Sequence, residues 1–225
     1  MSLPSRNALI LKGGGVKGLA FAGAVRELQE HFEFETYVGT SAGALAAALL
    51  AAGASAANLE TELRAKPFRD FLDGNNWTFF VTIPLYGGIH RGLALSNWIR
   101  DKLFSYLGKY NEVAMQDLPK RAVIYASQAN RDPVTFDKIG EHKDSAVHTA
   151  VRCSLSIPYF FQPEKLDSQP VYDGGLLNNF PVEIFLTQER KRQREEPDFI
   201  AIYLGPIAPP YRRTAPFSES DVNMD

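Results

Sequence analysis

Ser41 is the residue of this sequence best placed to act as a nucleophile. It is the centre of G-T-S-A-G at residues 39–43, a G-x-S-x-G pattern between a short apolar run at 36–40 and an alanine-rich run at 44–52. That context predicts a strand, a sharp turn and a helix. The turn would lift the hydroxyl clear of the backbone, and the positive end of the helix would face the attacking oxygen. The pattern predicts attack on a carbonyl carbon.

A glycine-rich turn precedes this serine. The sequence G-G-G-V-K-G at residues 13–18 follows an apolar run at 8–12 and opens a helical pattern. Several backbone N–H groups can point into one concavity there and bind negative charge. In an acyl hydrolase that charge is the oxyanion of the tetrahedral intermediate, and losing one donor costs about 2.7–4 kcal/mol.

The same glycines also satisfy the G-x-G-x-x-G fingerprint of dinucleotide-binding proteins. That interpretation requires an acid after the second strand, whereas Glu33 and Glu35 come before it. A Walker P-loop requires Lys and then Ser or Thr after its last glycine, but Gly18 is followed by leucine and alanine. A non-catalytic nucleotide- or anion-binding protein remains the alternative from another functional class.

Asp173 begins the sequence D-G-G after a short β-rich run at 171–172. An Asp-Gly pair is usually an ordinary turn, as expected for Asp73-Gly74. Here it follows a glycine nest and a G-x-S-x-G turn, in that order. Together with the glycine-rich lead into the helix at Leu95 and the I-P-Y-F of residues 154–163, this combination resembles patatin-like phospholipases.

The resemblance implies a serine lipid acyl hydrolase that cleaves a phospholipid or another fatty-acyl ester through an acyl-enzyme. By position, Ser41 is the nucleophile and Asp173 its base. The oxyanion loop comprises Gly13, Gly14, Gly15, Lys17 and Gly18. The family often carries Arg where Lys17 stands, which keeps the charge but loses the planar fork. No cofactor is implied. A hydrolase of soluble esters or thioesters remains a second alternative.

The histidines argue against a Ser-His-Asp triad. An α/β-hydrolase places its histidine after the acid, whereas all four histidines, the last being His148, precede Asp173. His148 is the nearest rival base, and its mixed-polarity helix favours a surface or half-buried role. No H-E-x-x-H or Cys/His set exists in the sequence, so no catalytic metal is expected.

Repeated strand-to-helix units must position these residues. Two such units in the first fifty residues predict a three-layer α/β/α fold with a mainly parallel sheet, and the site at strand ends. Helices are expected at 19–31, 44–52, 54–72, 95–107 and 144–154. Strands are expected at 121–128, 134–138 and 199–204. For the aromatic segment 77–86 a core strand is favoured over an interfacial loop. Residues 188–196 are expected to be a solvated helix end.

Composition limits the remaining possibilities. The chain has 225 residues, 45% of them hydrophobic, and a net charge of -2, which predicts one core and argues against nucleic acid as a partner. We expect a catalytic domain at 1–205 and a poorly ordered tail at 206–225. The lone Cys153 and the lack of a signal-peptide pattern favour the cytoplasm. The apolar stretch 42–59 is expected to be a buried helix and then a loop, which leaves peripheral contact with a membrane.

Overall fold

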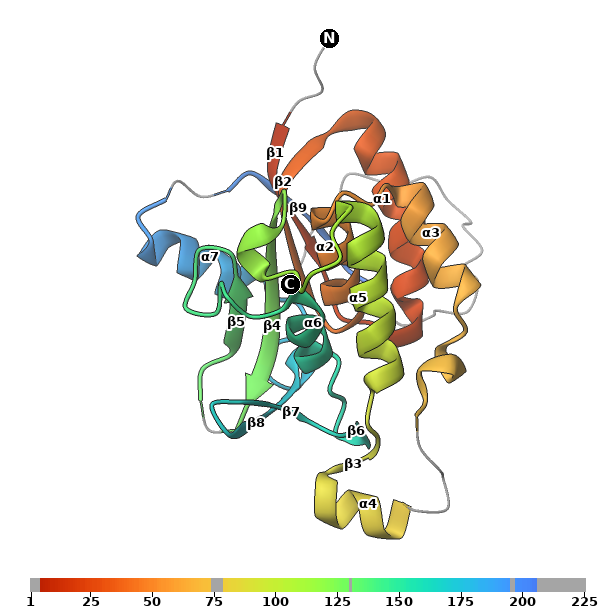
Figure 1. Cartoon of the computed structure of the whole chain (residues 1–225). Helices are drawn as coiled ribbons and strands as arrows, with labels where there is room; N and C mark the ends of the chain where they lie inside the picture. Colours follow the sequence, from red (N-terminus) through yellow and green to blue (C-terminus); the bar gives the residue numbers. More distant parts are fainter. Residues whose placement is uncertain (1–4, 74–78, 130, 195–196, 206–225) are drawn as a thin grey trace, which may run out of the picture.

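The computed structural model describes residues 5–73, 79–129, 131–194 and 197–205, and these residues build one main sheet (Figure 1). The strand order is β7-β8-β4-β2-β1-β9, with β5 also paired to β4. The strands are β1 (Ser5–Leu11), β2 (Glu33–Thr40), β4 (Arg121–Gln128), β5 (Val134–Asp137), β7 (Glu164–Leu166), β8 (Gln169–Asp173) and β9 (Phe199–Ile202). The four neighbours β4, β2, β1 and β9 are parallel, whereas β5, β7 and β8 pair antiparallel.

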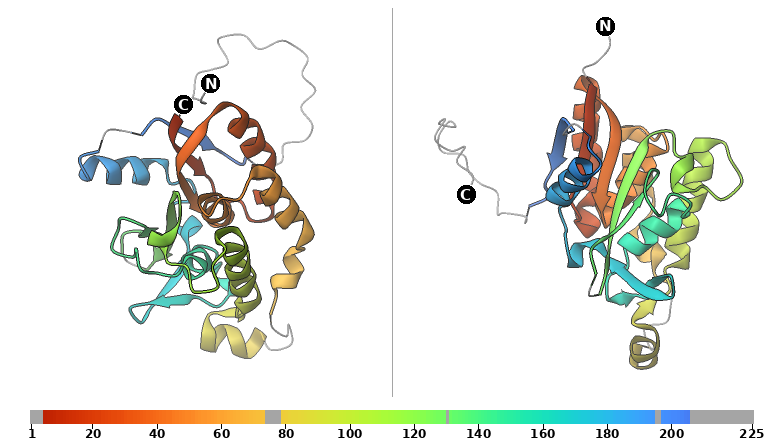
Figure 2. Two further views of the ribbon diagram at one scale, coloured as in Figure 1. Left: turned by 45° about the horizontal axis from the view of Figure 1, so that its top comes forward. Right: turned by 90° about the vertical axis from the view of Figure 1, so that its left-hand side faces the viewer.

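Helices cover both faces of the sheet, which confirms the predicted α/β/α layers (Figure 2). They are α1 (Ala20–His31), α2 (Ala42–Ala51), α3 (Ala56–Ala65), α4 (Phe79–Tyr86), α5 (Leu93–Leu107), α6 (Val147–Ser154) and α7 (Val182–Lys191). Alternate residues of β1 face opposite layers, as the strand period of two requires. Leu9 belongs to the larger core with α1, α2, α5 and α6, whereas Ile10 packs with Phe185 of α7.

The helix that follows Ser41 is buried along almost its whole length. Its alanine side chains occupy little volume, so α2 packs closely against β1 and β2. A Cβ added at Gly43 would collide with the Leu11 carbonyl, and one added at Gly39 would collide with the Gly43 backbone. Both glycines of the G-x-S-x-G pattern are therefore required by the close approach of helix and strands. The buried helix predicted within 42–59 is confirmed.

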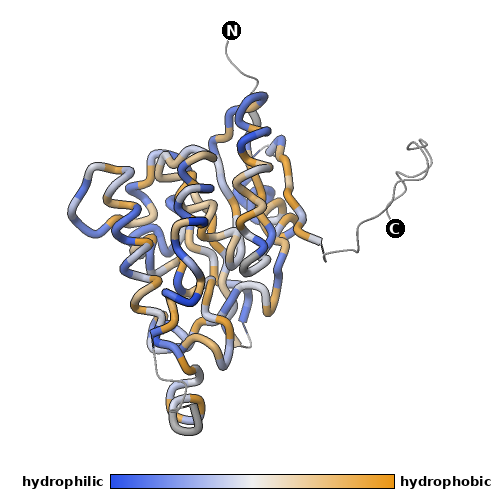
Figure 3. Tube along the Cα trace, turned by 90° about the vertical axis from the view of Figure 1, so that its right-hand side faces the viewer, coloured by the Kyte–Doolittle hydropathy of each residue, from blue (hydrophilic) through white to orange (hydrophobic). Residues whose placement is uncertain are grey.

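The strand predicted over residues 77–86 is wrong, because Phe79–Tyr86 forms helix α4. Residues 77 and 78 lie outside the described part of the chain. Figures 1 and 3 show α4 projecting from the body of the molecule beyond the end of the sheet. A segment without a neighbouring strand must satisfy its own backbone hydrogen bonds, and a helix does so. The chain then enters β3 (Gly88–His90), which pairs with β6 (Tyr159–Phe161) in a separate two-stranded sheet.

The expected solvated helix end at 188–196 is also wrong in part. Glu189 is only 4% exposed, and its carboxylate pairs with Arg121 at 2.8 Å and Arg192 at 3.1 Å. Both arginines also bind Asp137, at 2.7 and 2.9 Å. Burial alone would raise the pKa of Asp137, but the hydrogen bonds and charges of Arg121 and Arg192 outweigh it and lower that pKa. Glu189 and Arg192 therefore connect α7 and the residue after it to Arg121 of β4 and Asp137 of β5.

Two further expectations concern the C-terminal tail and the membrane. The tail expected at 206–225 lies outside the described residues, so the division into residues 1–205 and 206–225 remains a prediction. Within the described residues, every helix is too short or too polar to span a bilayer.

Candidate active site

The structure brings Ser41 and Asp173 into direct contact. The Ser41 Oγ donates a hydrogen bond to Asp173 Oδ2 at 2.7 Å, and both residues are buried, at 5% and 6% exposure. Strand β4 makes this possible, because it pairs with both strands that deliver the two residues. Thr40 lies opposite Tyr125, and Asp173 lies opposite the next residue, Ala126. The expected contact between these side chains, 132 residues apart, is confirmed.

The backbone at Ser41 is held in a sparsely populated conformation. Its φ of 53° and ψ of -122° belong to a region that costs a non-glycine residue about 1–3 kcal/mol. The surrounding contacts must therefore impose it. The Ser41 N–H donates to Ser154 Oγ at 2.8 Å, and the Ser41 carbonyl accepts from the N–H of Ala44 at 2.9 Å. These contacts fix the serine as a sharp turn at the start of α2.

Asp173 is held from both its backbone and its side chain. Its N–H donates to the Ser156 carbonyl at 2.9 Å, and its Oδ1 accepts from the Gly175 N–H at 2.7 Å. Burial raises the pKa of Asp173, although the hydrogen bonds from Ser41 and Gly175 act in the opposite direction. A carboxylate with a raised pKa is a stronger base, which suits a group that must accept a hydroxyl proton.

The glycine loop lies against the turn that carries Ser41, since a Cβ added at Gly13 would be 3.2 Å from the Thr40 carbonyl oxygen and one at Gly18 2.9 Å from Ala42 Cβ. Gly15 and Gly18 line the same cavity as the serine. The N–H of Gly13 donates to the Asn179 carbonyl at 2.8 Å and is therefore already paired. Gly14 lies instead against Leu204, because a Cβ added there would come within 2.8 Å of that side chain.

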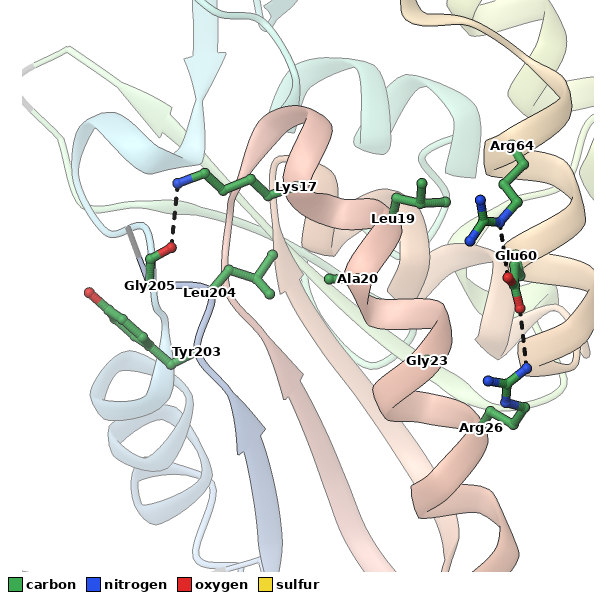
Figure 4. Close-up of a pocket in the computed structure, with 10 residues that line it drawn as sticks. All are labelled: Lys17, Leu19, Ala20, Gly23, Arg26, Glu60, Arg64, Tyr203, Leu204 and Gly205. Carbon is green, nitrogen blue, oxygen red and sulfur yellow. Dashed lines mark hydrogen bonds and ion pairs between the residues drawn. The ribbon is translucent and has the colours of Figure 1, made fainter. Parts of the chain in front are cut away.

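Lys17, which the resemblance placed in the oxyanion loop, directs its side chain elsewhere. Its N–H donates to the Gly14 carbonyl at 3.1 Å, and its ammonium group donates to the Gly205 carbonyl at 3.4 Å. Figure 4 shows this ammonium directed at Gly205. Lys17 lines a groove of about 660 Å³ together with Arg26 and Arg64. The groove is larger than the cavity beside Ser41 but lacks the serine, so the smaller cavity is the candidate site.

The cavity beside Ser41 is about 210 Å³ and mainly apolar. Its walls come from η1 (Gly15–Leu19), α2, α3, α5, the 3-10 helix Phe68–Phe71 and the segment after α6. The largest apolar side chains in these walls are Phe68, Phe71 and Phe161, and leucines such as Leu45 and Leu95 lie in size between them and the small residues of the loop. Such a cavity fits a hydrocarbon chain whose carbonyl lies at the serine hydroxyl, because apolar surface is released from water when the chain enters.

Sequence reasoning missed the residues that hold the pair in place. Ser154 is fully buried and supports Ser41, and Asn179 Nδ2 donates to the Gly13 carbonyl at 3.3 Å. The sequence provided only a weak indication for Ser154. Residues 154–163 contributed to the family resemblance, but no role was assigned to Ser154. For Asn179 the sequence carried no signal.

The histidine expected as the nearest rival base lies with another serine. His148 Nδ1 is 2.9 Å from Ser96 Oγ, and its Nε2 is 3.0 Å from Glu112. The contacts of His148 with Ser96 and Glu112 connect α6 to α5 and to the loop between residues 108 and 114. The imidazole ring of His148 is half-buried, as expected. Within the described ranges, no group of three or more potential His, Cys, Asp or Glu ligands gathers as a metal site would.

Comparisons with known proteins agree with this architecture. The family model for patatin-like phospholipase matches residues 9–186. The uncharacterized protein YqhO of Bacillus subtilis (strain 168) is 34% identical over 204 residues, which are 81% of this chain and 67% of that protein. The uncharacterized NTE family protein Rv2565 of Mycobacterium tuberculosis (strain ATCC 25618 / H37Rv) is 31% identical over 177 residues, 78% of this chain and only 27% of that protein.

A solved structure supports the same fold. The crystal structure of VipD from Legionella pneumophila matches 79% of this chain and 47% of its own, with a TM-score of 0.57 and 18% identity. At that identity the likeness is one of fold. The family model, by contrast, covers well over half of the sequence and includes both Ser41 and Asp173. This chain therefore belongs to the patatin-like phospholipase family.

Proposed function

We propose that this chain is a serine lipid acyl hydrolase in which Ser41 attacks the ester carbonyl and Asp173 acts as its base. The observation that carries the proposal is the 2.7 Å hydrogen bond between the two side chains at the end of an apolar cavity. The family supports lipid hydrolysis. The substrate in this proposal is a phospholipid or another fatty-acyl ester whose acyl chain enters the cavity.

The geometry supports a two-step reaction. As Ser41 Oγ bonds to the carbonyl carbon, its proton moves to Asp173 Oδ2, and the carbonyl oxygen becomes an oxyanion. Gly15 and Gly18 line the cavity with Ser41, so their loop is the proposed oxyanion site, and the N-terminus of α2 adds its positive end. The ester C–O bond then breaks, and Asp173 returns the proton to the leaving alcohol. Water hydrolyses the acyl-enzyme with Asp173 again as base.

A fluorophosphonate probe tests the nucleophile. The wild-type chain should be labelled on Ser41, and Ser41→Ala should lose both labelling and turnover. A Ser41→Ala protein that hydrolyses phospholipid at the wild-type rate would refute the proposal, and an unlabelled wild-type chain would favour an anion-binding protein without catalysis.

A series of esters with short and long acyl chains tests the substrate class. The apolar cavity predicts higher kcat/KM for long chains, since each buried methylene contributes about 0.8 kcal/mol. No preference for chain length would instead indicate a hydrolase of soluble esters or thioesters.

A cytoplasmic location with peripheral membrane contact is part of the proposal. Its support is the lone Cys153, which suits a reducing compartment.

A further inference from the structure

Exposed hydrophobic side chains lie on several segments close to the candidate site. Among the described residues, eleven large hydrophobic side chains are exposed. Six of them lie on α4, on the segment from α6 into β6, and on the turn after Asp173. We call these six the apolar rim: Leu85, Tyr86, Ile157, Tyr159, Leu176 and Leu177.

The rim is continuous with the candidate site. Ile157 lines the Ser41 cavity itself. Pro158, the next residue, lines a second hollow of about 320 Å³ together with Tyr159, Leu176, Leu177 and Gly87, the residue that follows α4. The Tyr159 N–H donates to the Gly87 carbonyl at 3.1 Å, which joins α4 to the segment beside the site. An apolar surface therefore extends from the serine cavity to the projecting helix.

None of the six rim residues belongs to either hydrophobic cluster of the described core. Leu85 is 67% exposed and Tyr159 is 69% exposed. Clustered apolar side chains on a surface mark a site of contact with another body, whereas scattered ones need no explanation. Figure 1 shows α4 and β6 at the end of the sheet where β2 finishes at Thr40, directly before Ser41.

We propose that the apolar rim docks this chain on a lipid bilayer and presents the Ser41 cavity to acyl esters in that surface. The inference rests on the proposed function. A protein held permanently on the rim would cover the cavity mouth, whereas a bilayer supplies substrate through the same contact. Leucine and isoleucine side chains can enter the acyl region, and tyrosine rings with their hydroxyl groups suit the headgroup boundary.

Vesicle flotation tests the rim separately from catalysis. The Ser41→Ala chain is mixed with phosphatidylcholine vesicles, and its binding is compared with that of the same chain carrying Leu85→Ser/Tyr86→Ser or Leu176→Ser/Leu177→Ser. Each pair should bind at least about tenfold more weakly, because two large side chains no longer enter the bilayer. Neutral vesicles exclude a purely electrostatic explanation.

Tyr110→Ser is the matched control. Tyr110 is 92% exposed, but it follows the far end of α5, a helix of 15 residues that starts beside the site. At 1.5 Å per residue, about 22 Å separates the two ends of that helix. The control should bind vesicles as strongly as the unmodified chain. Equal weakening by Tyr110→Ser would contradict a localised rim.

Fluorophosphonate labelling keeps the two proposals distinguishable. If Ser41 is unlabelled but the rim pairs reduce vesicle binding, docking stands and the catalytic proposal fails. If Ser41 is labelled and both pairs bind vesicles as strongly as the parent chain, docking fails alone. A parent chain that is dimeric by light scattering and becomes monomeric in both pairs would also overturn docking, because the rim would then be an interface between copies. Thermal melting of each pair checks that it is folded.

Discussion

The N–H of Ser41 donates a hydrogen bond to Ser154 Oγ at 2.8 Å, and the same hydroxyl donates to the Tyr125 carbonyl at 2.6 Å. Two residues further on, the Ser156 carbonyl accepts from the Asp173 N–H at 2.9 Å. The C-terminal end of α6 therefore holds the backbone of both candidate catalytic residues. The distance between these two residues therefore depends on this segment, which also lines the Ser41 cavity.

Replacing Ser154 with alanine should lower kcat without a matching change in KM. The variant leaves the buried Ser41 N–H without its acceptor, which costs about 1–3 kcal/mol, and it loosens a strained turn. We expect kcat for a soluble ester to fall about tenfold or more. Steady-state kinetics with a soluble ester would measure this.

The control for Ser154→Ala is Ser156→Ala. Ser156 is equally buried, but its hydroxyl accepts from Arg152 and does not contact Ser41. This control should keep its kcat closer to the wild-type value. Equal losses in both variants would mean that the effect is a general weakening of α6.

Replacing Asp173 with asparagine should greatly lower activity and stabilise the fold at neutral pH. Because burial raises the pKa of Asp173 above 3.8, ionisation costs the folded state more than the unfolded one. The contribution of Asp173 to the free energy of unfolding is therefore fully present below the pKa that it has in the unfolded chain. That contribution is lost as the pH rises through the higher pKa that Asp173 has in the folded protein. At pH 7 the variant escapes that cost, so its Tm should exceed that of the wild type. The difference should vanish below about pH 4.

The same carboxylate controls the pH dependence of turnover. Wild-type kcat/KM should fall on acidification through the raised pKa of Asp173, because only the carboxylate can accept the proton. Asp173→Asn should lose about 10²–10⁴-fold in rate. The exposed Asp101→Asn serves as a control for both measurements. An Asp173→Asn variant that melts below the wild type at pH 7 would contradict the assigned cost of ionisation.

Asp73 should stabilise the first turn of α5. The Asp73 carboxylate accepts hydrogen bonds from the N–H groups of Gly92, Leu93 and Ala94, the last at 3.2 Å. The sequence suggested only an ordinary turn at Asp73. Asp73→Ala removes this cap and should lower the free energy of unfolding by about 0.5–2 kcal/mol in urea titrations. Asp101→Ala, on the same helix, should have little effect. No change in Asp73→Ala would mean that water replaces the cap without cost.

The thiol of Cys153 should be inert in the folded protein. It is 1% exposed, and burial, followed by the charge of Glu164, raises its pKa to about 12. Since the thiolate is the reactive form, iodoacetamide at pH 8 should leave the native chain unmodified. The same reagent should label the chain in urea, which makes labelling a probe of unfolding. Rapid labelling without urea would show that α6 opens readily.

Much of the fold followed from local patterns. The runs ending at Leu11 and Thr40 are apolar and closely followed by glycine, and they became neighbouring parallel strands because each leads directly into a helix. Residues 79–86 show the limit of such patterns. Alternating aromatic and β-branched residues suit a strand only where another strand is beside them, and here there is none in the main sheet.

The sequence by itself determined which residues carry the proposed chemistry. A serine between small residues at a strand-to-helix turn, and an Asp-Gly-Gly after a later strand, were recognisable because their local backbone requires those residue types. Only the tertiary structure decided what surrounds them. It directed the Gly13 N–H to Asn179, buried Glu189 among arginines, and set Ser154 behind Ser41. These contacts join distant segments, and they depend on which strands pair, a property that no local pattern of residues contains.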